Sequence, residues 1–522
     1  MGAALVTRLL VGAIVALFFI IRIACETISF YWLRPRRIRM IMERQGVRGP
    51  NPRFLVGNIP EMAKLIAKST ANDMNYVNHN VVPRLLPHYA IWSKTYGKRF
   101  VFWNGTEPRL CVTDLGMINT LLRKYSMVSG KSWMQQQGVK HFIGRGLLFA
   151  NGDEWYQQRH ILAPAFTPHK LKRYCVDVEE STAQMIEKLN TKIREGRSEF
   201  EISEYLKQLT AEIISKLEFG PNFEKGKQIF TRLTDLQRLS AQASKHLCLP
   251  GSRFFPSKYN RQIKALKGEV DKSLMEIIQG RKDCVDIGRS DTHGQDFLGV
   301  LLDEIGREKM NGSSDHNGFH LNLEMIMDEL KTFFFAGHDT TALLLSWTVM
   351  LLATNPLWQD KVRAEVKDVC GSDAPSSQHV SKFCVLSMVI NESLRLYPSA
   401  TLIPRMAFQD FQLGDLLIPK GLSIWIPVVA IHHNEELWGL DVNEFNPNRF
   451  ATRVGGHFLP FGAGPRNCIG QAFALMEAKI ILASLIQRFN FVISNNYRHA
   501  PEVVLTVRPK YGIQVILKPV TA

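Results

Sequence analysis

The most specific stretch of the sequence is Phe461-Gly462-Ala463-Gly464-Pro465-Arg466-Asn467-Cys468-Ile469-Gly470. Its small residues and its proline predict a tight loop, and Gly464 and Gly470 would let the backbone approach a flat ligand closely. The following residues, 472–487, have a helical composition, so Cys468 is expected just before a helix N-terminus. Backbone N–H groups and the helix dipole at such a position favour a thiolate.

The cysteine pattern does not indicate a disulfide framework. The chain has eight cysteines in 522 residues, and none is paired in a C-x-x-C spacing, which indicates a reducing compartment. A lone thiolate in a glycine-rich loop suits an axial ligand of haem iron.

The most legible helix is Leu323–Thr354. Asn322 can cap its start and Asn355-Pro356 ends it, which gives a length of about 48 Å. Its apolar residues lie nearly all round, so the helix is expected to be buried. Its middle nevertheless reads Ala336-Gly337-His338-Asp339-Thr340-Thr341, where glycine costs about 1 kcal/mol and threonine is a poor helix former. A buried helix with residues of low helix propensity at its middle is a candidate functional site.

Two further spacings place an acid or an aromatic residue beside an arginine on one helix face. Glu392 and Arg395 lie at i,i+3, and Arg449, in a Pro-x-Arg-Phe segment about fifty residues later, could close a buried triad. Trp155 and Arg159 lie at i,i+4. Each pair alone is weak evidence, since most exposed ion pairs of this kind contribute little.

Helical patterns dominate the rest of the chain. Strand-like runs are few: residues 99–103, 109–113, 422–427, 503–507 and 513–517. The expected fold is therefore mainly α with small β-sheets, in one large domain.

The N-terminus predicts a single membrane anchor. Residues 9–21 are an unbroken apolar run, and with the continuation to Leu33 they form about 37 Å of helix, enough to span a bilayer. Aromatic residues and then arginines follow, as expected at a cytoplasmic interface. A cleaved signal peptide and an amphipathic surface helix are the alternatives. We expect an anchor over residues 1–33, a basic, Pro/Gly-rich linker over 34–60 and the main domain over 61–522.

The distribution of net charge supports the predicted membrane topology. The chain carries +16, but the first sixty residues hold nine arginines, no lysine and two acids. Much of the excess therefore belongs to the anchor flank. No basic, aromatic-interleaved motif appears elsewhere, which disfavours nucleic-acid binding.

Together these motifs resemble those of cytochrome P-450, the haem-thiolate monooxygenases. The F-x-x-G-x-R-x-C-x-G loop is highly specific, and E-x-x-R, P-x-R-F, W-x-x-x-R and A-G-x-D/E-T-T occur in the family's order. The resemblance covers about residue 50 to the C-terminus and implies the P-450 fold behind a single transmembrane helix.

The resemblance also implies roles for individual residues. Cys468 would be the proximal ligand of haem b, and Asp339 and Thr340 would deliver protons during dioxygen activation. The structural triad would be Glu392, Arg395 and Arg449. The remaining haem-binding positions would be Trp155, Arg159, Arg405 and Arg466, at the propionates, Ala336 and Gly337, at the dioxygen gap, and Phe461 and Gly470, in the cysteine loop. His338, at the family's variable position, is expected to pack and not to bind metal.

Electrons must come from another protein, because the chain has no Gly-rich dinucleotide fingerprint and no flavin segment. The resemblance implies an NADPH-dependent reductase on the same endoplasmic reticulum membrane, with the catalytic domain facing the cytosol. A basic face around the cysteine loop would suit an acidic partner.

Several stretches look like those of the cytokinin hydroxylases in a plant clan of non-A-type P-450 proteins, among them residues 131–138, 141–148 and 496–501. These enzymes hydroxylate the isopentenyl side chain of N6-isopentenyladenine nucleotides at the trans methyl, giving trans-zeatin forms. The target methyl is expected beside Phe333, Ala336, Thr340, Thr401 and Leu402. The candidates for reading the phosphate are Lys140, His141 and Arg145.

Two other interpretations remain open at this point. The substrate could be another apolar plant metabolite, such as a gibberellin, a brassinosteroid or a fatty acid. The protein could also be a thiolate-haem isomerase or sensor, but relatives of that kind commonly lose the Asp339-Thr340 pair.

Overall fold

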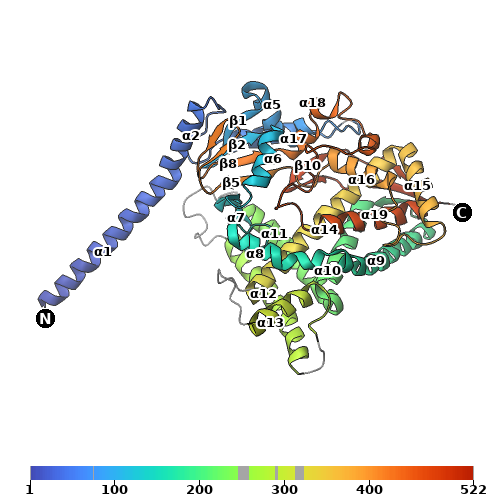
Figure 1. Cartoon of the computed structure of the whole chain (residues 1–522), viewed down its shortest axis with the longest axis horizontal. Helices are drawn as coiled ribbons and strands as arrows, with labels where there is room; N and C mark the ends of the chain where they lie inside the picture. Colours follow the sequence, from blue (N-terminus) through green and yellow to red (C-terminus); the bar gives the residue numbers. More distant parts are fainter. Residues whose placement is uncertain (1, 75, 245–257, 288–291, 312–321, 521–522) are drawn as a thin grey trace.

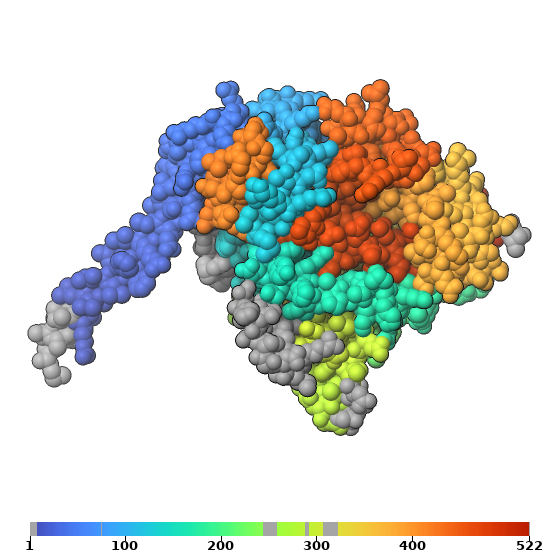
Figure 2. All heavy atoms as spheres, in the orientation of Figure 1, coloured from blue at the N-terminus to red at the C-terminus, as the bar shows by residue number. Residues whose placement is uncertain are grey.

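The computed structural model of the chain describes residues 2–74, 76–244, 258–287, 292–311 and 322–520. Its N-terminal part is one continuous helix that projects from the body of the molecule (Figures 1 and 2). This helix comprises α1 (Gly2–Ile28), a π-helical turn (Ser29–Leu33) and α2 (Arg34–Arg44). The part from Arg8 to Arg44 is long and apolar enough to cross a membrane.

The junction between this helix and the body differs from the expected linker over residues 34–60. Residues 34–44 are helical, and Ile38 and Met42 are buried in the apolar cluster that also contains strand residues of the main sheet. Phe30, in the π-helical turn, packs edge-on against Trp133, with the ring centroids 5.9 Å apart. The apolar i,i+4 pair Ile38 and Met42 explains the difference, because it gives α2 a face that the sheet can cover.

Helices form most of the body, in agreement with the expected fold class. In chain order they are α3 (Ile59–Ser69), α4 (Val82–Leu85), α5 (Pro87–Tyr96), α6 (Leu115–Lys124), α7 (Trp133–Val139), α8 (Gly152–Leu162), α9 (Pro168–Arg194), α10 (Ile202–Phe219), α11 (Phe223–Ser244), α12 (Lys258–Asp286), α13 (Phe297–Asn311), α14 (Leu323–Thr354), α15 (Pro356–Cys370), α16 (Val385–Leu396), α17 (Val428–His432), α18 (Glu435–Trp438) and α19 (Gln471–Arg488). Short 3-10 turns lie at Ala163–Phe166, Gly220–Asn222 and Pro447–Phe450.

The strands form small sheets. The largest has the order β1-β2-β8-β5-β3. Its strands are β1 (Arg99–Asn104), β2 (Glu107–Val112), β8 (Ser423–Ile426), β5 (Ile403–Ala407) and β3 (Ser129–Gly130). A second sheet has the order β4 (Glu199–Glu201), β12 (Gln514–Pro519) and β9 (Phe489–Ile493), and two hairpins pair β6 (Phe411–Leu413) with β7 (Leu416–Ile418) and β10 (Pro501–Val504) with β11 (Thr506–Pro509).

The expected strand over residues 503–507 is wrong as a single element. The chain turns at Leu505, whose φ is +67°, so its two halves belong to β10 and β11 of one hairpin. No turn residue such as glycine or asparagine marks this reversal, and the strand-like composition of residues 503–507 therefore concealed it. The hairpin places Thr506, Val507 and Arg508 beside the middle of α14.

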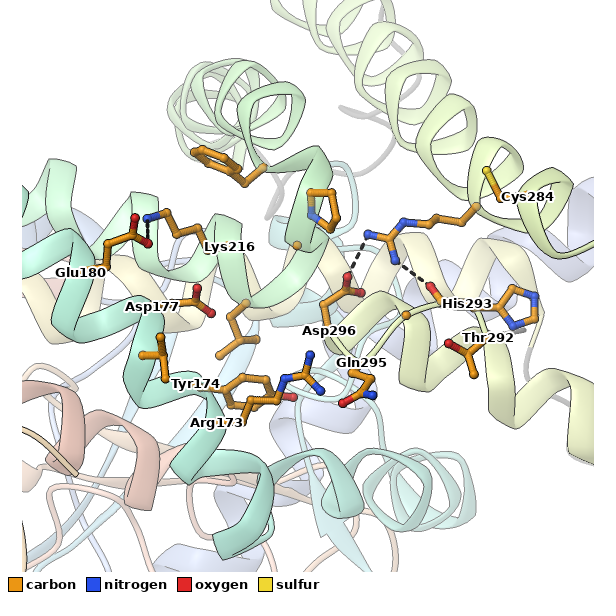
Figure 3. A pocket seen from close by; sticks show the side chains of 17 residues that line it. Arg173, Tyr174, Asp177, Glu180, Lys216, Cys284, Thr292, His293, Gln295 and Asp296 are labelled. Carbon is orange, nitrogen blue, oxygen red and sulfur yellow. Dashed lines mark hydrogen bonds and ion pairs between the residues drawn. The ribbon is translucent and has the colours of Figure 1, made fainter. Parts of the chain in front are cut away.

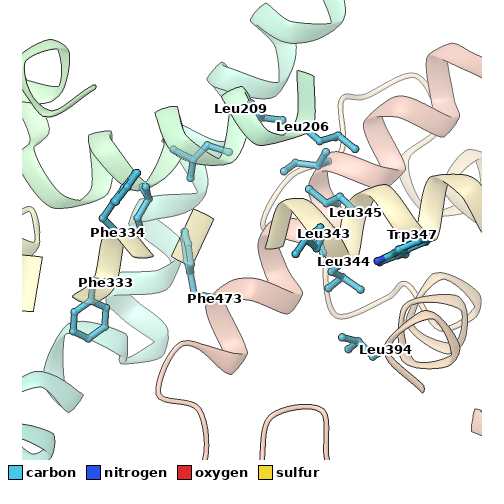
Figure 4. Close-up of a cluster of buried hydrophobic side chains, with 14 of the residues drawn as sticks. Leu206, Leu209, Phe333, Phe334, Leu343, Leu344, Leu345, Trp347, Leu394 and Phe473 are labelled. Atoms are coloured by element: carbon cyan, nitrogen blue, oxygen red, sulfur yellow. The ribbon is translucent and has the colours of Figure 1, made fainter. Parts of the chain in front are cut away.

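Helix α14 forms the centre of the core, as its pattern predicts. Asn322 caps it by accepting a hydrogen bond from the Met325 N–H at 2.9 Å. Apolar side chains surround its second half, where Leu343, Leu344, Leu345 and Trp347 meet residues of α10, α16 and α19 (Figure 4). Among the described residues of α14 after its first turn and before Thr354, the partly exposed ones are Phe335, Ala336, Gly337, Asp339 and Thr340. The irregular middle of this helix is thus also the part that a ligand can reach.

Candidate functional site

The middle of α14 offers two polar side chains that do not contact each other. The Thr340 hydroxyl donates to the Ala336 carbonyl at 2.6 Å. The Asp339 carboxylate instead accepts hydrogen bonds from the Thr506 hydroxyl and the Arg508 guanidinium, both at 3.1 Å. Sequence reasoning found Asp339 and Thr340 but missed their partners, because Thr506 and Arg508 lie far along the chain and belong to no motif.

Gly337 has a packing role that the sequence analysis did not predict. A Cβ atom there would lie 2.7 Å from Cδ1 of Ile214 on α10, so the glycine lets two core helices approach. The expected dioxygen gap at Ala336 and Gly337 therefore stays a prediction, and the close helix contact is the feature that the structure describes.

The cysteine loop is held by its own backbone and by the neighbouring α6. The Cys468 N–H donates to the Phe461 carbonyl at 2.8 Å. Gly464 has a φ of +71°, and a Cβ on it would lie 2.2 Å from the Leu122 carbonyl oxygen. This glycine thus serves a tight contact within the protein, and its expected close approach to a ligand stays a prediction. Gly470 does leave open space around its missing Cβ.

Cys468 is an exposed free thiol three residues before the start of α19 at Gln471, as expected. Desolvation raises its pKa above the ordinary value, while N–H groups of Gly470 and Gln471 and the charge of Arg159 act in the opposite direction. The helix N-terminus therefore assists ionisation of the thiol without completing it. A bound cation is the group that would complete it.

Positive charge collects near this loop without a carboxylate to balance it among the described residues. Burial lowers the pKa of Arg405 to about 10 and that of Arg466 to about 9. Burial also lowers the pKa of Lys131 to about 7, and the charges of Arg405 and Arg466 contribute. The Nε atoms of Arg405 and Arg466 are buried and have no hydrogen-bond partner. A doubly anionic ligand fits this cluster, and Lys131 is a member that the motifs did not reveal.

The W-x-x-x-R residues lie against the same loop. Trp155 is buried on α8, and the Arg466 guanidinium lies 4.4 Å from the centroid of its ring. The Arg159 guanidinium donates to the Asn467 carbonyl at 2.7 Å and to the Asn467 side chain at 3.0 Å. The structure therefore brings Trp155, Arg159, Arg466 and Cys468 together from two distant segments.

A buried carboxyl links the cysteine helix to α14. Glu477 on α19 is hydrogen-bonded with Thr341, the neighbour of Thr340, and burial raises the pKa of Glu477 to about 8. This contact fixes the first turns of α19 against the irregular middle of α14. Sequence reasoning missed Glu477, because an isolated acid in an apolar helix carries no spacing signal.

The expected triad forms behind the loop. Arg395 donates from Nε and Nη2 to the two oxygens of Glu392 at 2.7 and 2.8 Å, and both side chains are fully buried. Arg449 Nε lies 3.6 Å from the nearer Glu392 oxygen. Arg395 also donates to the carbonyls of His432 and Val442, so the pair organises the segment that leads to the cysteine loop.

Two residues of α14 pack against other aromatic rings. His338 is buried, stacks on Phe334 and shares its Nδ1 with the Phe334 carbonyl at 2.7 Å, which agrees with a packing role. Phe333 is buried between Phe166 and Phe297, with centroids 5.4 and 4.5 Å away. Its ring therefore packs on the Ala163–Phe166 turn and on α13, and its expected place beside the substrate methyl stays a prediction.

The candidate phosphate residues lie on the loop after α7. Lys140 and His141 are exposed, and the charges of Lys140 and Lys267 add to desolvation in lowering the pKa of His141. Arg145 is exposed and ion-paired with Glu154 at 2.8 Å. Two buried acids of α14 bind the backbone of this loop. Asp328 accepts a hydrogen bond from the Arg145 N–H at 2.8 Å, and Glu329 accepts one from the Leu147 N–H at 3.0 Å.

The segment before β5 supplies the last two candidates. Thr401 is buried, and its carbonyl accepts the Val429 N–H at 3.3 Å. Leu402 is half-buried beside the apolar core. Leu402 is therefore the more accessible of the two side chains.

A separate cavity of about 780 Å³ lies between α9, α10 and α12 (Figure 3). Its walls include the ion pairs Lys216–Glu180 and Arg281–Asp296, at 3.2 and 2.8 Å. None of the motif residues lines it. Its size is thus not evidence for the reaction, whose groups gather around α14 and Cys468.

A thiol at a helix N-terminus, unbalanced cations beside it and an irregular core helix match one known architecture. The family model described as cytochrome P450 matches residues 82–517. The chain belongs to the cytochrome P450 family. As a P450 it is a haem-thiolate monooxygenase that takes electrons from a redox partner and acts on a small molecule.

Individual P450 relatives are similar over almost their whole length. Two cytokinin hydroxylases of Arabidopsis thaliana are 61% and 60% identical, over 96% and 97% of this chain and 97% of each relative. Cytochrome P450 734A1 of Arabidopsis thaliana is 37% identical over 94% of both chains.

The residues present fit the P450 haem. Lys131, Arg405 and Arg466, which have no carboxylate partner among the described residues, would receive its propionates, since charge-assisted hydrogen bonds to carboxylates are the strong ones. Cys468 would supply the thiolate, and the partly exposed residues of α14 would face the reacting side. These assignments rest on the donor set, the burial and the unmet hydrogen bonds described above.

Replacing Glu392 by alanine should destabilise this P450 strongly. The change leaves the buried Arg395 charge without its partner, which costs about 3–5 kcal/mol. Arg99→Ala is the matched control, because the Arg99–Asp415 ion pair is exposed and such pairs contribute about 0–1 kcal/mol. Urea unfolding followed by circular dichroism measures both. Equal losses in the two variants would contradict the structural role of the triad.

Haem affinity should fall as pH rises above 7, and Lys131 should cause part of that fall. Without an anion the pKa of Lys131 is about 7 instead of 10.5, and a propionate would restore the charged form. Binding above pH 7 therefore takes up a proton, so higher pH weakens it. Transfer of haem to excess apomyoglobin between pH 7 and 9 should accelerate in the wild type and depend less on pH in Lys131→Met.

The exposed Lys124 on α6 provides the control for this titration, and Lys124→Met should follow the wild-type curve. Parallel pH curves for Lys131→Met and the wild type would exclude Lys131 from the anion site.

Proposed function

We propose that this P450 hydroxylates the isopentenyl side chain of N6-isopentenyladenine nucleotides at the trans methyl, giving trans-zeatin-type cytokinins. The observation that carries the proposal is the 61% and 60% identity to cytokinin hydroxylases along almost the whole of each chain. The 734A1 relative, at 37%, is much less similar, so the identity does not favour the alternative substrates.

The cofactor and electron source follow from the same proposal. The haem is haem b, and an NADPH-dependent reductase delivers the electrons. Both proteins lie on the endoplasmic reticulum membrane, and the catalytic domain of this P450 faces the cytosol. The helix from Arg8 to Arg44 supports membrane anchoring, and the arginines that follow its apolar part support the orientation.

The chain's own residues position the substrate and move protons. When bound, haem supplies dioxygen activation and the transfer of one oxygen atom to a C–H bond. The Thr340 hydroxyl, fixed by its bond to the Ala336 carbonyl, keeps its oxygen free to accept a hydrogen bond from water. Asp339, on the solvent side, renews the proton by general acid catalysis. The half-buried Leu402 and Phe335 provide apolar surface for the isopentenyl group.

The phosphate of the substrate lies at the loop after α7. Arg145 already pairs with Glu154, which leaves Lys140 and His141 as the better candidates. Their backbone is held near α14 because Asp328 and Glu329 bind the following N–H groups. A dianionic phosphate would favour protonated His141, since neighbouring negative charge offsets the effect of Lys140.

Purified enzyme with reductase and NADPH should convert isopentenyladenosine phosphate to the trans-zeatin form and leave a gibberellin unchanged. Lys140→Ala and His141→Ala should raise KM for the nucleotide by about tenfold, the effect of one lost charge-assisted hydrogen bond, with little change for the nucleoside. Product and KM are measured by liquid chromatography.

Arg145→Ala is the matched control in the same loop and should change KM little for either substrate. Equal KM increases for nucleotide and nucleoside would contradict phosphate reading by Lys140 or His141. Gibberellin turnover without cytokinin turnover would contradict the proposed substrate.

A further inference from the structure

The hairpin of β10 and β11 is fixed against the middle of α14 by backbone contacts from both sides. The Val507 carbonyl accepts the Trp347 indole N–H at 3.0 Å, and the Val507 N–H donates to the Ser399 carbonyl at 3.2 Å. The Ser399 hydroxyl in turn donates to the Thr340 carbonyl at 3.0 Å. The position of β11 relative to the proton-relay turn is therefore set by the fold and does not depend on side chains at the hairpin tip.

This anchored strand presents two side chains to one oxygen of Asp339. Thr506 Oγ1 donates to Asp339 Oδ2 at 3.1 Å, and Arg508 Nη2 donates to the same oxygen at 3.1 Å. Arg508 Nη2 also donates to Thr506 Oγ1 at 3.0 Å. The three groups close a triangle in which the threonine hydroxyl both accepts and donates, so its orientation is determined.

The triangle lies between the interior and water. The Asp339 side chain is 14% exposed and that of Arg508 is 30% exposed. Thr340 turns its hydroxyl to the Ala336 carbonyl and not to Asp339. A proton from water can therefore reach the Asp339 carboxylate from the Arg508 side. For the proton to continue to Thr340, the carboxylate must be held where a water molecule can bridge the two side chains.

We propose that Thr506 and Arg508 are the positioning residues of the proton relay. They hold the Asp339 carboxylate at the water-facing end of the α14 site, so that the acid is correctly placed without blocking the substrate side. The inference rests on the proposed role of Asp339 and Thr340 and adds two residues outside every motif of the chain. Neither residue needs to contact the substrate.

The test measures coupling of electron use to product formation. Arg508→Met and Thr506→Val should lower product formed per NADPH about tenfold, the effect of losing a charge-assisted hydrogen bond, with more hydrogen peroxide and an unchanged KM. Arg508→Lys keeps the charge but not the planar fork and should restore part of the yield, as should Thr506→Ser.

Arg498→Met is the matched control. Arg498 lies on the same C-terminal segment and pairs with Asp73 instead of Asp339, so its loss should leave the yield unchanged. Wild-type yield and wild-type peroxide in Arg508→Met would overturn the proposal.

A double-mutant cycle provides a readout that does not depend on turnover. Arg508→Met and Asp339→Asn should be non-additive in the unfolding equilibrium constant by about tenfold, because each removes the same interaction. Additive effects would overturn the inference even if both variants lost activity. Substrate binding is measured separately, as the change in haem spin state when isopentenyladenosine phosphate is added to the wild type. No spin-state change would contradict the proposed substrate. The double-mutant cycle would still test the role of Arg508 in that case.

Discussion

The site depends on positive charge held away from water without a carboxylate beside it. Lys131, Arg405 and Arg466 come from the loop before α7, from β5 and from the cysteine loop, and burial lowers the pKa of each. Such a cluster is unfavourable until an anion enters it. A doubly anionic ligand therefore fits this part of the fold, and Cys468, in the loop that carries Arg466, is the group that we expect to bind that ligand's metal.

Other buried contacts fix the position of the cysteine loop relative to the middle of α14, on the two sides of the ligand site. Behind the cysteine loop, the buried pair of Glu392 and Arg395 fixes the segment that leads to Cys468. Glu477 ties α19 to α14 through Thr341, and the β11 hairpin ties Asp339 from the other direction. Buried polar groups that the core would otherwise exclude hold these elements in place, because each has a defined partner and cannot shift without losing it.

The sequence predicted the parts of this arrangement that are local. The bounds of α14, the position of Cys468 before α19 and the spacing of Glu392 and Arg395 all follow from helix caps and i,i+3 geometry. Contacts between distant segments could not be read in this way. The Arg508–Asp339 bond, the hairpin reversal at Leu505, the docking of α2 and the packing of Phe333 between Phe166 and Phe297 depend on how separate elements meet in space.

We expect Cys468 to be the thiolate ligand of a haem whose propionates occupy the cluster of Lys131, Arg405 and Arg466. The most direct measurement is the absorption spectrum of the reduced protein with carbon monoxide. The wild type should show the red-shifted Soret band of thiolate ligation, and Cys468→Ser should lose it while Cys384→Ser, which changes another exposed cysteine, keeps it. A red-shifted band that survives in Cys468→Ser would contradict the account.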